Sequence, residues 1–252
     1  MAADNQAREV KFRRIAGDLR RAIRGGEYAP GDRIPGENAL MAEYGVARMT
    51  ARQALGVLVD EGLTEPRKGK GVFVRDVRPT VRRVVQRLSR EQWGAGRSVW
   101  ESETEGRDLV VDQIQVSETE LPESAAEALG LQAGEPACVR DRRYVLDGKP
   151  VTVARSYLPL ALVAGSPVMQ QDTGPGGVYA RLAELGHTPT CFSEQITCRM
   201  ATPEESCRLK LPTASPVIES RRTAFSETGR AVEVNHMIMD AASYVLQFDF
   251  DA

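Results

Sequence analysis

Hydrophobic residues at helical spacing dominate the first quarter of the chain. Apolar side chains recur every three or four positions, with arginine and lysine between them, which is typical of amphipathic helices packed on a small core. Glycine pairs and Pro-Gly steps separate these segments, and a basic turn at 67–71 separates two short apolar strands. The pattern predicts three helices and then two strands, at 9–24, 37–43, 48–61, 63–66 and 72–75. This order predicts a winged helix-turn-helix.

The remainder of the chain alternates between apolar and polar positions, which is typical of strands with one buried face. The order strand, helix, hairpin occurs in 109–158 and again in 191–240, so we predict an internally duplicated α+β domain with a largely antiparallel sheet. Predicted strands are 109–116, 137–146, 151–158, 191–200, 217–226, 231–240 and 245–250; predicted helices are 122–129, 178–185 and 203–209. We divide the chain into a first domain at 1–76, a linker at 77–90 and a second domain at 91–252.

Charge is distributed unevenly between these parts. Residues 1–90 hold 19 Lys and Arg against 11 Asp and Glu, whereas residues 91–252 hold 14 against 24. A basic first third on an acidic remainder indicates that only the first third contacts a polyanion. No apolar run is long enough to span a bilayer, and the N-terminus lacks the apolar stretch of a signal peptide, so we expect a cytoplasmic protein without membrane contact.

The third predicted helix carries the residues that suit a nucleic acid. Arg48 and Arg52 are four apart and share a helix face, and a guanidinium can bind guanine in bidentate fashion. Thr50 and Gln53 can contact bases or phosphates, and Asn38 can reach the backbone. In the predicted turn, Gly69 lets the protein backbone approach DNA closely, and Lys68 and Lys70 supply positive charge. We therefore predict that the first domain binds the major groove of double-stranded DNA.

Residues 11–75 resemble the DNA-binding domain of the GntR family of bacterial regulators. The resemblance rests on the stretches GEYAPGDRIPGE (26–37), YGVARMTARQAL (44–55), EGL (61–63) and GKGVFV (69–74). It implies DNA contacts for the positions Asn38, Arg48, Thr50, Arg52 and Gly69. The chain departs from the family at two helix N-caps, where Gly36 and Ala47 replace serine. Alanine at an N-cap typically costs about 1 kcal/mol, so we expect slightly weaker DNA binding.

Residues 85–250 resemble the UTRA domain of the HutC subfamily, a sensor with a chorismate-lyase-like fold. The resemblance rests on RRY (142–144), DGKPV (147–151), RSYLP (155–159), VYARL (178–182) and VE (232–233). It implies a small-molecule effector bound between the sheet and the loop after the linker. By position, the effector would contact Ser89, Arg90, Arg142, Tyr144, Arg155, Tyr179 and Glu233.

Three departures bear on the class of that effector. Phosphosugar-binding relatives tend to have Arg, Ser and Tyr where Tyr144, Gly177 and Met239 stand in this chain. These replacements predict a pocket that is less cationic and more apolar than a phosphosugar site.

These observations favour a homodimeric repressor that a small molecule releases from a palindromic operator. One alternative is an enzyme of chorismate-lyase-like fold with a DNA-binding module, but the only histidines are His187 and His236, and no nucleophile is recognisable. A second alternative, an all-helical sensor, conflicts with the alternating segments. We expect no cofactor and no metal, because the spacing of His187, Cys191 and Cys198 fits no recurring zinc pattern.

Overall fold

The computed structural model describes residues 2–76, 79–96, 99–100, 104, 106–212 and 215–249, with side chains from Lys11 onward except Gln92. It divides into two compact units, Met1–Arg78 and Pro79–Ala252, each with its own core.

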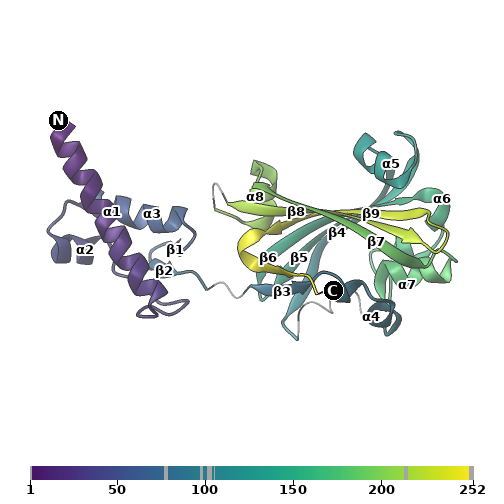
Figure 1. The fold of residues 1–252 in the computed structure, drawn as a ribbon, viewed down its shortest axis with the longest axis horizontal. Helices are drawn as coiled ribbons and strands as arrows, with labels where there is room; N and C mark the ends of the chain where they lie inside the picture. The colour runs from purple at the N-terminus through teal and green to yellow at the C-terminus, as the bar shows by residue number, and fades with distance from the viewer. Residues whose placement is uncertain are drawn as a thin grey trace. The chain divides into compact units, whose positions relative to one another are not determined.

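The first unit is a three-helix core with a two-stranded wing (Figure 1). Its elements are α1 (Ala2–Arg24), α2 (Glu37–Tyr44), α3 (Arg48–Asp60), β1 (Thr64–Arg67) and β2 (Gly71–Val74). Ile15, Leu40 and Leu58 are almost fully buried where the three helices meet. Gly45, with φ +60°, turns the chain between α2 and α3 in the left-handed conformation that glycine tolerates. The predicted winged helix-turn-helix is confirmed.

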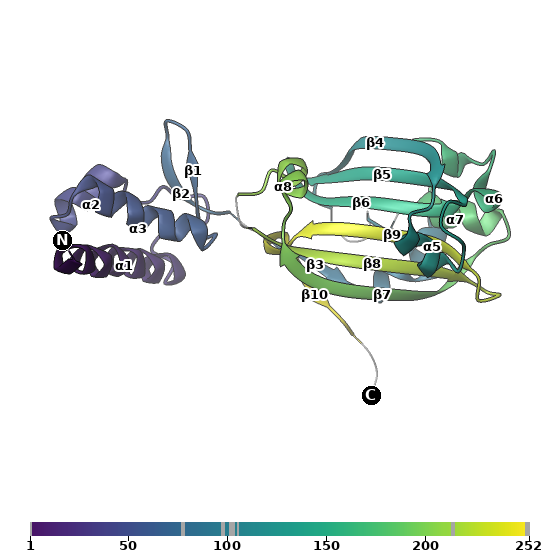
Figure 2. The same cartoon turned by 90° about the horizontal axis from the view of Figure 1, so that it is seen from above.

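The second unit is built on a six-stranded antiparallel sheet in the order β4-β5-β6-β9-β8-β7 (Figure 2). The strands are β4 (Leu109–Glu120), β5 (Pro136–Leu146), β6 (Lys149–Pro159), β7 (Pro189–Met200), β8 (Pro216–Ser226) and β9 (Ala231–Asp240). Each half contributes three consecutive strands, and the halves meet where β6 pairs with β9. The helices α5 (Glu123–Leu129) and α8 (Pro203–Leu209) occupy equivalent places after β4 and β7. The predicted duplication of an antiparallel α+β unit is confirmed.

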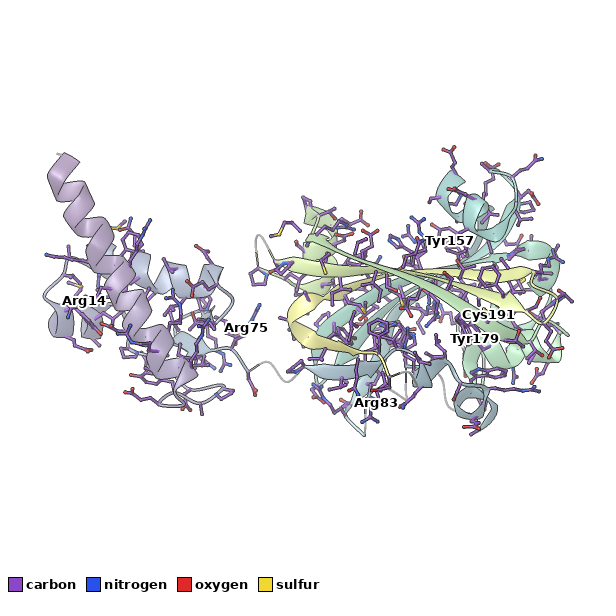
Figure 3. All side chains as sticks on the ribbon, in the orientation of Figure 1. Arg14, Arg75, Arg83, Tyr157, Tyr179 and Cys191 are labelled. Atoms are coloured by element: carbon purple, nitrogen blue, oxygen red, sulfur yellow. The ribbon has the colours of Figure 1, made fainter. Side chains whose placement is uncertain are left out.

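The two faces of this sheet carry different elements. One face, here named the α5 face, is covered by α5 and α8, whose apolar residues pack beside Tyr157 and Val153. The other, the α7 face, carries α4 (Arg90–Gly94), α6 (Leu160–Val163) and α7 (Gly177–Glu184). In the described part of the chain it also carries the 3₁₀ turns Gln86–Leu88, Pro167–Met169 and Ala241–Ser243. Tyr157 and Tyr179 lie on opposite sides of the sheet (Figure 3).

The predicted linker differs most from the structure. Residues 80–83 form strand β3 (Thr80–Arg83), which pairs in parallel with β10 (Tyr244–Gln247) and lies within the second unit. Hydrophobic patterning gives no indication of β3, because the side chains it buries are Thr80 and Arg82. Its partner lies some 160 positions along the chain. The strand predicted at 245–250 ends at Gln247, and Phe250 lies outside the described residues.

Candidate functional site

The third helix of the first unit presents its charged face to solvent. Ala51, Ala54 and Leu58 bury the opposite face against α1 and α2. The side chains of Arg48 and Arg52 remain 60% and 59% exposed, in the first turn and a half of α3. This is the part of a recognition helix that reaches base edges in the major groove.

Glu37, at the first position of α2, holds both arginines. The Nε of Arg52 donates to the Glu37 carboxylate over 2.7 Å, and the Nε of Arg48 lies 3.2 Å from the same group. Arg48 also donates to Oδ1 of Asn38 over 3.2 Å. The hydrogen bond from Arg52 lowers the pKa of Glu37, so the carboxylate is ionised. Sequence reasoning missed Glu37, although an acid at the start of α2 across a tight corner from two arginines was a usable indication.

Other predicted DNA contacts differ in accessibility. Gln53 is exposed, whereas Thr50 is only 4% exposed and belongs to the buried residues of α3. Lys68, Gly69 and Lys70 form the exposed turn between β1 and β2. Their DNA contacts stay predictions, and the geometry favours Gln53 and the turn over Thr50.

The two N-cap departures leave α2 and α3 without side-chain caps. Gly36 and Ala47 both adopt extended backbone conformations suited to capping, but neither has a side chain that accepts a hydrogen bond. At α8, by contrast, Thr202 and Glu205 form a complete capping box. The backbone at Ala47 is thus already placed for a serine cap.

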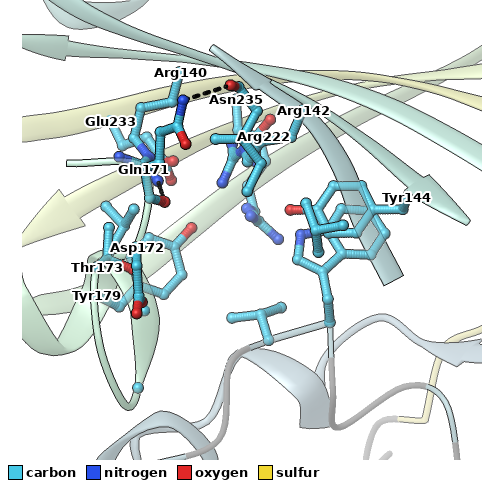
Figure 4. A pocket seen from close by; sticks show the side chains of 17 residues that line it. Arg140, Arg142, Tyr144, Gln171, Asp172, Thr173, Tyr179, Arg222, Glu233 and Asn235 are labelled. Atoms are coloured by element: carbon cyan, nitrogen blue, oxygen red, sulfur yellow. Dashed lines mark hydrogen bonds between the residues drawn. The ribbon is translucent and has the colours of Figure 1, made fainter. Parts of the chain in front are cut away.

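A cavity of about 400 Å³ opens on the α7 face of the sheet (Figure 4). Strands β4, β5, β8 and β9 supply its floor, and the segment from Gln171 to Tyr179 supplies one wall. Tyr144 lies on one side of the cavity, Tyr179 and the loop residues Asp172 and Thr173 lie on the other, and Arg142 and Arg222 lie between them. Side chains from both halves of the duplicated sheet therefore converge on one site.

Arg140, Arg142 and Arg222 contribute positive charge to the cavity wall. Arg140 is 3% exposed and donates to the backbone carbonyls of Val168, Gln170 and Gln171, which fixes the loop before α7. Its burial lowers the pKa of Arg140 to about 10, so it remains cationic at neutral pH. Arg142 donates to the hydroxyl of Ser156, and the Arg222 guanidinium lies 5.6 Å from the centre of the Tyr179 ring.

Three buried side-chain oxygens of the cavity wall have no hydrogen-bond partner among the described residues. They are the Tyr179 hydroxyl, Oε2 of Glu233 and Oδ1 of Asn235, on side chains that are 4%, 2% and 1% exposed. Burial raises the pKa of Tyr179, so its phenol is neutral and can donate. Buried polar groups are nearly always hydrogen-bonded in folded proteins. All three side chains line the cavity, so a bound molecule or water can supply partners for them there.

Aromatic and aliphatic side chains line the rest of the cavity. The Trp100 ring stacks on Tyr144 with 3.9 Å between ring centroids and an interplanar angle of 25°. Val111, Ile114 and Val178 complete this apolar part. A ligand can therefore place its carbon skeleton here and its polar groups toward Arg142 and Glu233.

The N-terminus of α7 borders the same cavity. Its N-cap, Gly176, has φ +80°, and a Cβ there would lie 2.6 Å from both Cβ of Ala180 and the carbonyl oxygen of Trp93. Only glycine fits this close approach. Because the backbone N–H groups of a first helical turn carry partial positive charge, this end of α7 adds to the attraction for an anion.

Four of the seven predicted effector residues line this cavity, namely Arg142, Tyr144, Tyr179 and Glu233. Ser89 and Arg90 are not among the lining residues, and they lie at the start of α4. Arg155 lies on the α5 face, where it donates to Asp141 over 2.7 Å. Sequence reasoning missed the lining residues Arg140, Arg222 and Asn235. Arg140 lies two positions before Arg142 on β5, and Asn235 lies two positions after Glu233 on β9, so the period of two along a strand was the signal that could have found them.

A β-bulge explains the position of Arg155. Near the turn of the β5–β6 hairpin, Leu146 pairs with Lys149, and continuing that register would place Arg155 beside Arg140 on the α7 face. The register shifts by one residue between Tyr144 and Val145, so Arg155 pairs with Asp141 instead. One inserted residue reverses the face of every side chain beyond it. The predicted effector contact of Arg155 has no support in this arrangement.

The charge of the cavity also differs from the expectation. Tyr144, Gly177 and Met239 predicted a less cationic pocket, but Arg140 and Arg222 add two guanidinium groups beside Arg142. Met239 does not line the cavity, and its sulfur lies 2.7 Å from a guanidinium nitrogen of buried Arg82.

Other candidate sites carry less chemistry. Among the described residues no group of three His, Cys, Asp or Glu side chains is placed to hold a metal ion. Cys138 is buried, and Cys191, Cys198 and Cys207 are exposed free thiols. No helix in the described part of the chain is long and apolar enough to cross a membrane.

Comparisons with known proteins agree with this architecture. The profile described as bacterial regulatory proteins, gntR family, matches residues 11–74, and the UTRA domain profile matches residues 104–245. The HTH-type transcriptional regulator RB1450 of Rhizobium meliloti is 32% identical over 225 residues, which cover 88% of this chain and 87% of that protein. The mannosyl-D-glycerate transport/metabolism system repressor MngR of Escherichia coli is 28% identical and covers 92% of each chain.

A crystal structure assigned to a GntR-family transcriptional regulator shares the fold. It superposes with a TM-score of 0.63 at 26% identity and covers 96% of this chain and 98% of its own. The winged helix-turn-helix, the effector-sized cavity and these relatives lead to one conclusion. The chain belongs to the GntR family of bacterial transcription regulators and joins its DNA-binding domain to a UTRA ligand-binding domain, as a ligand-responsive DNA-binding regulator.

Proposed function

We propose that the protein is a homodimeric cytoplasmic repressor, and that a hydroxylated organic anion bound in the cavity releases it from a palindromic operator. The observation that carries the effector class is the cavity wall, where Arg142 and Arg222 lie beside the unpartnered acceptors of Glu233 and Asn235. The arginines favour a carboxylate or phosphate, and the acceptors favour hydroxyl or amine donors. The E. coli relative is named for a system whose compound contains glycerate, itself a hydroxylated carboxylate.

We assign the cavity a binding role rather than a catalytic one. The described residues that line it include no histidine, cysteine or serine that could serve as a nucleophile with its base. Its groups instead suit recognition of charge, hydroxyl groups and an apolar skeleton.

The route from the cavity to the first unit runs through β3. Arg82 of β3 is fully buried, and its guanidinium lies 5.1 Å from the ring centroid of Trp100, which lines the cavity. Arg87, just beyond β3, forms a salt bridge of 2.6 Å with Glu194. An effector that displaces Trp100 would therefore shift the strand that directly follows the first unit. These contacts of Arg82 and Arg87 support the proposal that effector and operator binding oppose each other.

We infer the homodimer from the symmetry of the proposed operator. A palindromic operator presents two half-sites related by two-fold symmetry, and two copies of the first unit match that symmetry. Sedimentation velocity should give the mass of two chains, and a monomer that binds the full operator with full affinity would contradict this part.

Selection of operators from random duplex DNA tests the DNA-binding half. We expect Arg48→Ala and Arg52→Ala to weaken operator binding by about tenfold or more each, because a bidentate arginine contributes about 1–3 kcal/mol of discrimination. The matched control is Arg230→Ala, which removes an exposed arginine in the β8–β9 turn of the second unit. Unchanged affinity in both α3 variants would contradict the proposed recognition helix.

A panel of sugar phosphates, sugar acids and simple carboxylates then tests the sensing half. A compound of one class should dissociate the operator complex, and Arg142→Gln should abolish that response without changing operator affinity. If no compound of the panel releases the operator, the proposed anionic class is wrong.

A further inference from the structure

Met49 occupies the middle of the exposed face of α3. Successive helical residues are about 100° apart, which places Met49 between Arg52 and Gln53 on the face opposite the buried residues. Its side chain is 50% exposed. Of the large hydrophobic side chains described in the first unit, only that of Met49 is exposed.

The neighbouring polar side chains leave Met49 uncovered. Arg48 and Arg52 are both drawn to the carboxylate of Glu37 at the start of α2. Because Met49 is half exposed, it forms an apolar centre within an otherwise charged and polar surface of α3.

We propose that Met49 reads the 5-methyl group of a thymine in each operator half-site. This inference rests on the proposed insertion of α3 into the major groove. The thymine methyl is the apolar group that base edges display there, and apolar side chains contact it. A methionine suits this contact because its unbranched, polarizable side chain adapts to an irregular surface.

The proposal gives Met49 a role that the arginines cannot fill. Arg48 and Arg52 select guanine through hydrogen bonds, whereas Met49 selects a T·A pair through burial of one methyl group. The half-site should therefore contain a thymine whose methyl group contributes to affinity.

Replacement of thymine by deoxyuridine tests this directly, because it removes only the methyl group. In the selected operator, each thymine of a half-site is replaced in turn, symmetrically in both half-sites, and binding is measured by fluorescence anisotropy. We expect one position at which wild-type protein binds about fourfold more weakly per half-site, the factor that burial of one methyl group corresponds to. The same replacement should not change binding of Met49→Ala, whereas Met49→Leu should retain most of the discrimination.

Met200→Ala is the matched control, because Met200 is 53% exposed at the end of β7 in the second unit. It should discriminate thymine from deoxyuridine as the wild type does. The proposal is overturned if wild-type protein binds all deoxyuridine duplexes equally well, or if Met49→Ala still discriminates at the sensitive position. Arg48→Ala and Arg52→Ala separate this failure from failure of the proposed function: if they weaken binding, α3 reads the operator even where Met49 does not.

Discussion

Replacement of Glu194 by glutamine should destabilise the second unit strongly. Glu194 of β7 has a side chain that is 8% exposed, and it accepts hydrogen bonds from Arg87 and Ser220. Its nearest oxygen lies 3.6 Å from the fully buried guanidinium of Arg82. Burial raises the pKa of Glu194, but Arg87, Arg82 and Arg222 outweigh burial and leave the pKa below its usual value. The carboxylate is therefore ionised, and its charge balances buried arginines.

The expected magnitude follows from what Glu194→Gln leaves behind. The variant keeps an acceptor oxygen but removes the negative charge from a site with two almost fully buried cations. Removal of one partner of a buried ion pair typically costs about 3–5 kcal/mol. With a urea dependence of about 2 kcal/mol/M, the unfolding midpoint should fall by about 1.5–2.5 M.

Tryptophan fluorescence during urea titration measures this effect in the full chain. Trp93 and Trp100 are both buried in the second unit, so the signal reports that unit. Glu184→Gln is the control, because its carboxylate is 59% exposed and pairs with Arg181 of the same helix, α7. We expect a cost of at most about 1 kcal/mol there. Equal midpoints for the two variants would refute the charge-balancing role of Glu194.

Three further predictions concern other parts of the molecule. Gly56→Ala should stabilise the first unit by about 0.5–1 kcal/mol, measured by far-ultraviolet circular dichroism, because nothing lies within 4 Å of a Cβ at this helical position. Ala47→Ser should cap α3, stabilise the first unit by about 1 kcal/mol and tighten operator binding; unchanged affinity in a titration would count against it. Although burial raises the pKa of Asp141 and Asp240, arginine and lysine partners leave both pKa values lowered. The two carboxylates therefore contribute their full stabilisation of the folded state above about pH 5, and this stabilisation is lost as the pH falls below about 4. The urea midpoint of the second unit should fall as the pH is lowered through this range.

The sequence predicted most of the fold because its periodicities are strong. Amphipathic spacing in the first unit and alternation in the second placed the major helices and sheet strands to within a few residues, except that α1 begins at Ala2, seven positions before its predicted start. The short strand β3 was missed because it buries Thr80 and Arg82 instead of hydrophobic residues, and because its partner β10 is remote in sequence. From sequence alone, a strand that buries an arginine cannot be distinguished from a solvated basic segment. The distinction requires the compensating carboxylate of Glu194, which is remote in sequence.

The candidate site was predictable only where strand register was simple. Arg142 and Tyr144 are two positions apart on β5, so assigning one of them to the correct face of the sheet also assigns the other. The bulge beside Tyr144 reverses the face of Arg155, and no turn or composition feature in the hairpin marks that extra residue. Arg222 reaches the cavity from the second half of the duplicated sheet, so its position depends on the pairing of β8 with β9 and of β9 with β6.

The coupling between the cavity and operator DNA is the central claim, and calorimetric titration of the effector measures it most directly. The effector is titrated into wild-type protein alone and into protein saturated with the selected operator. Because linkage is reciprocal, the operator should weaken effector binding by the same factor, about tenfold or more, by which the effector weakens operator binding. Equal effector affinity in the two titrations would contradict the account.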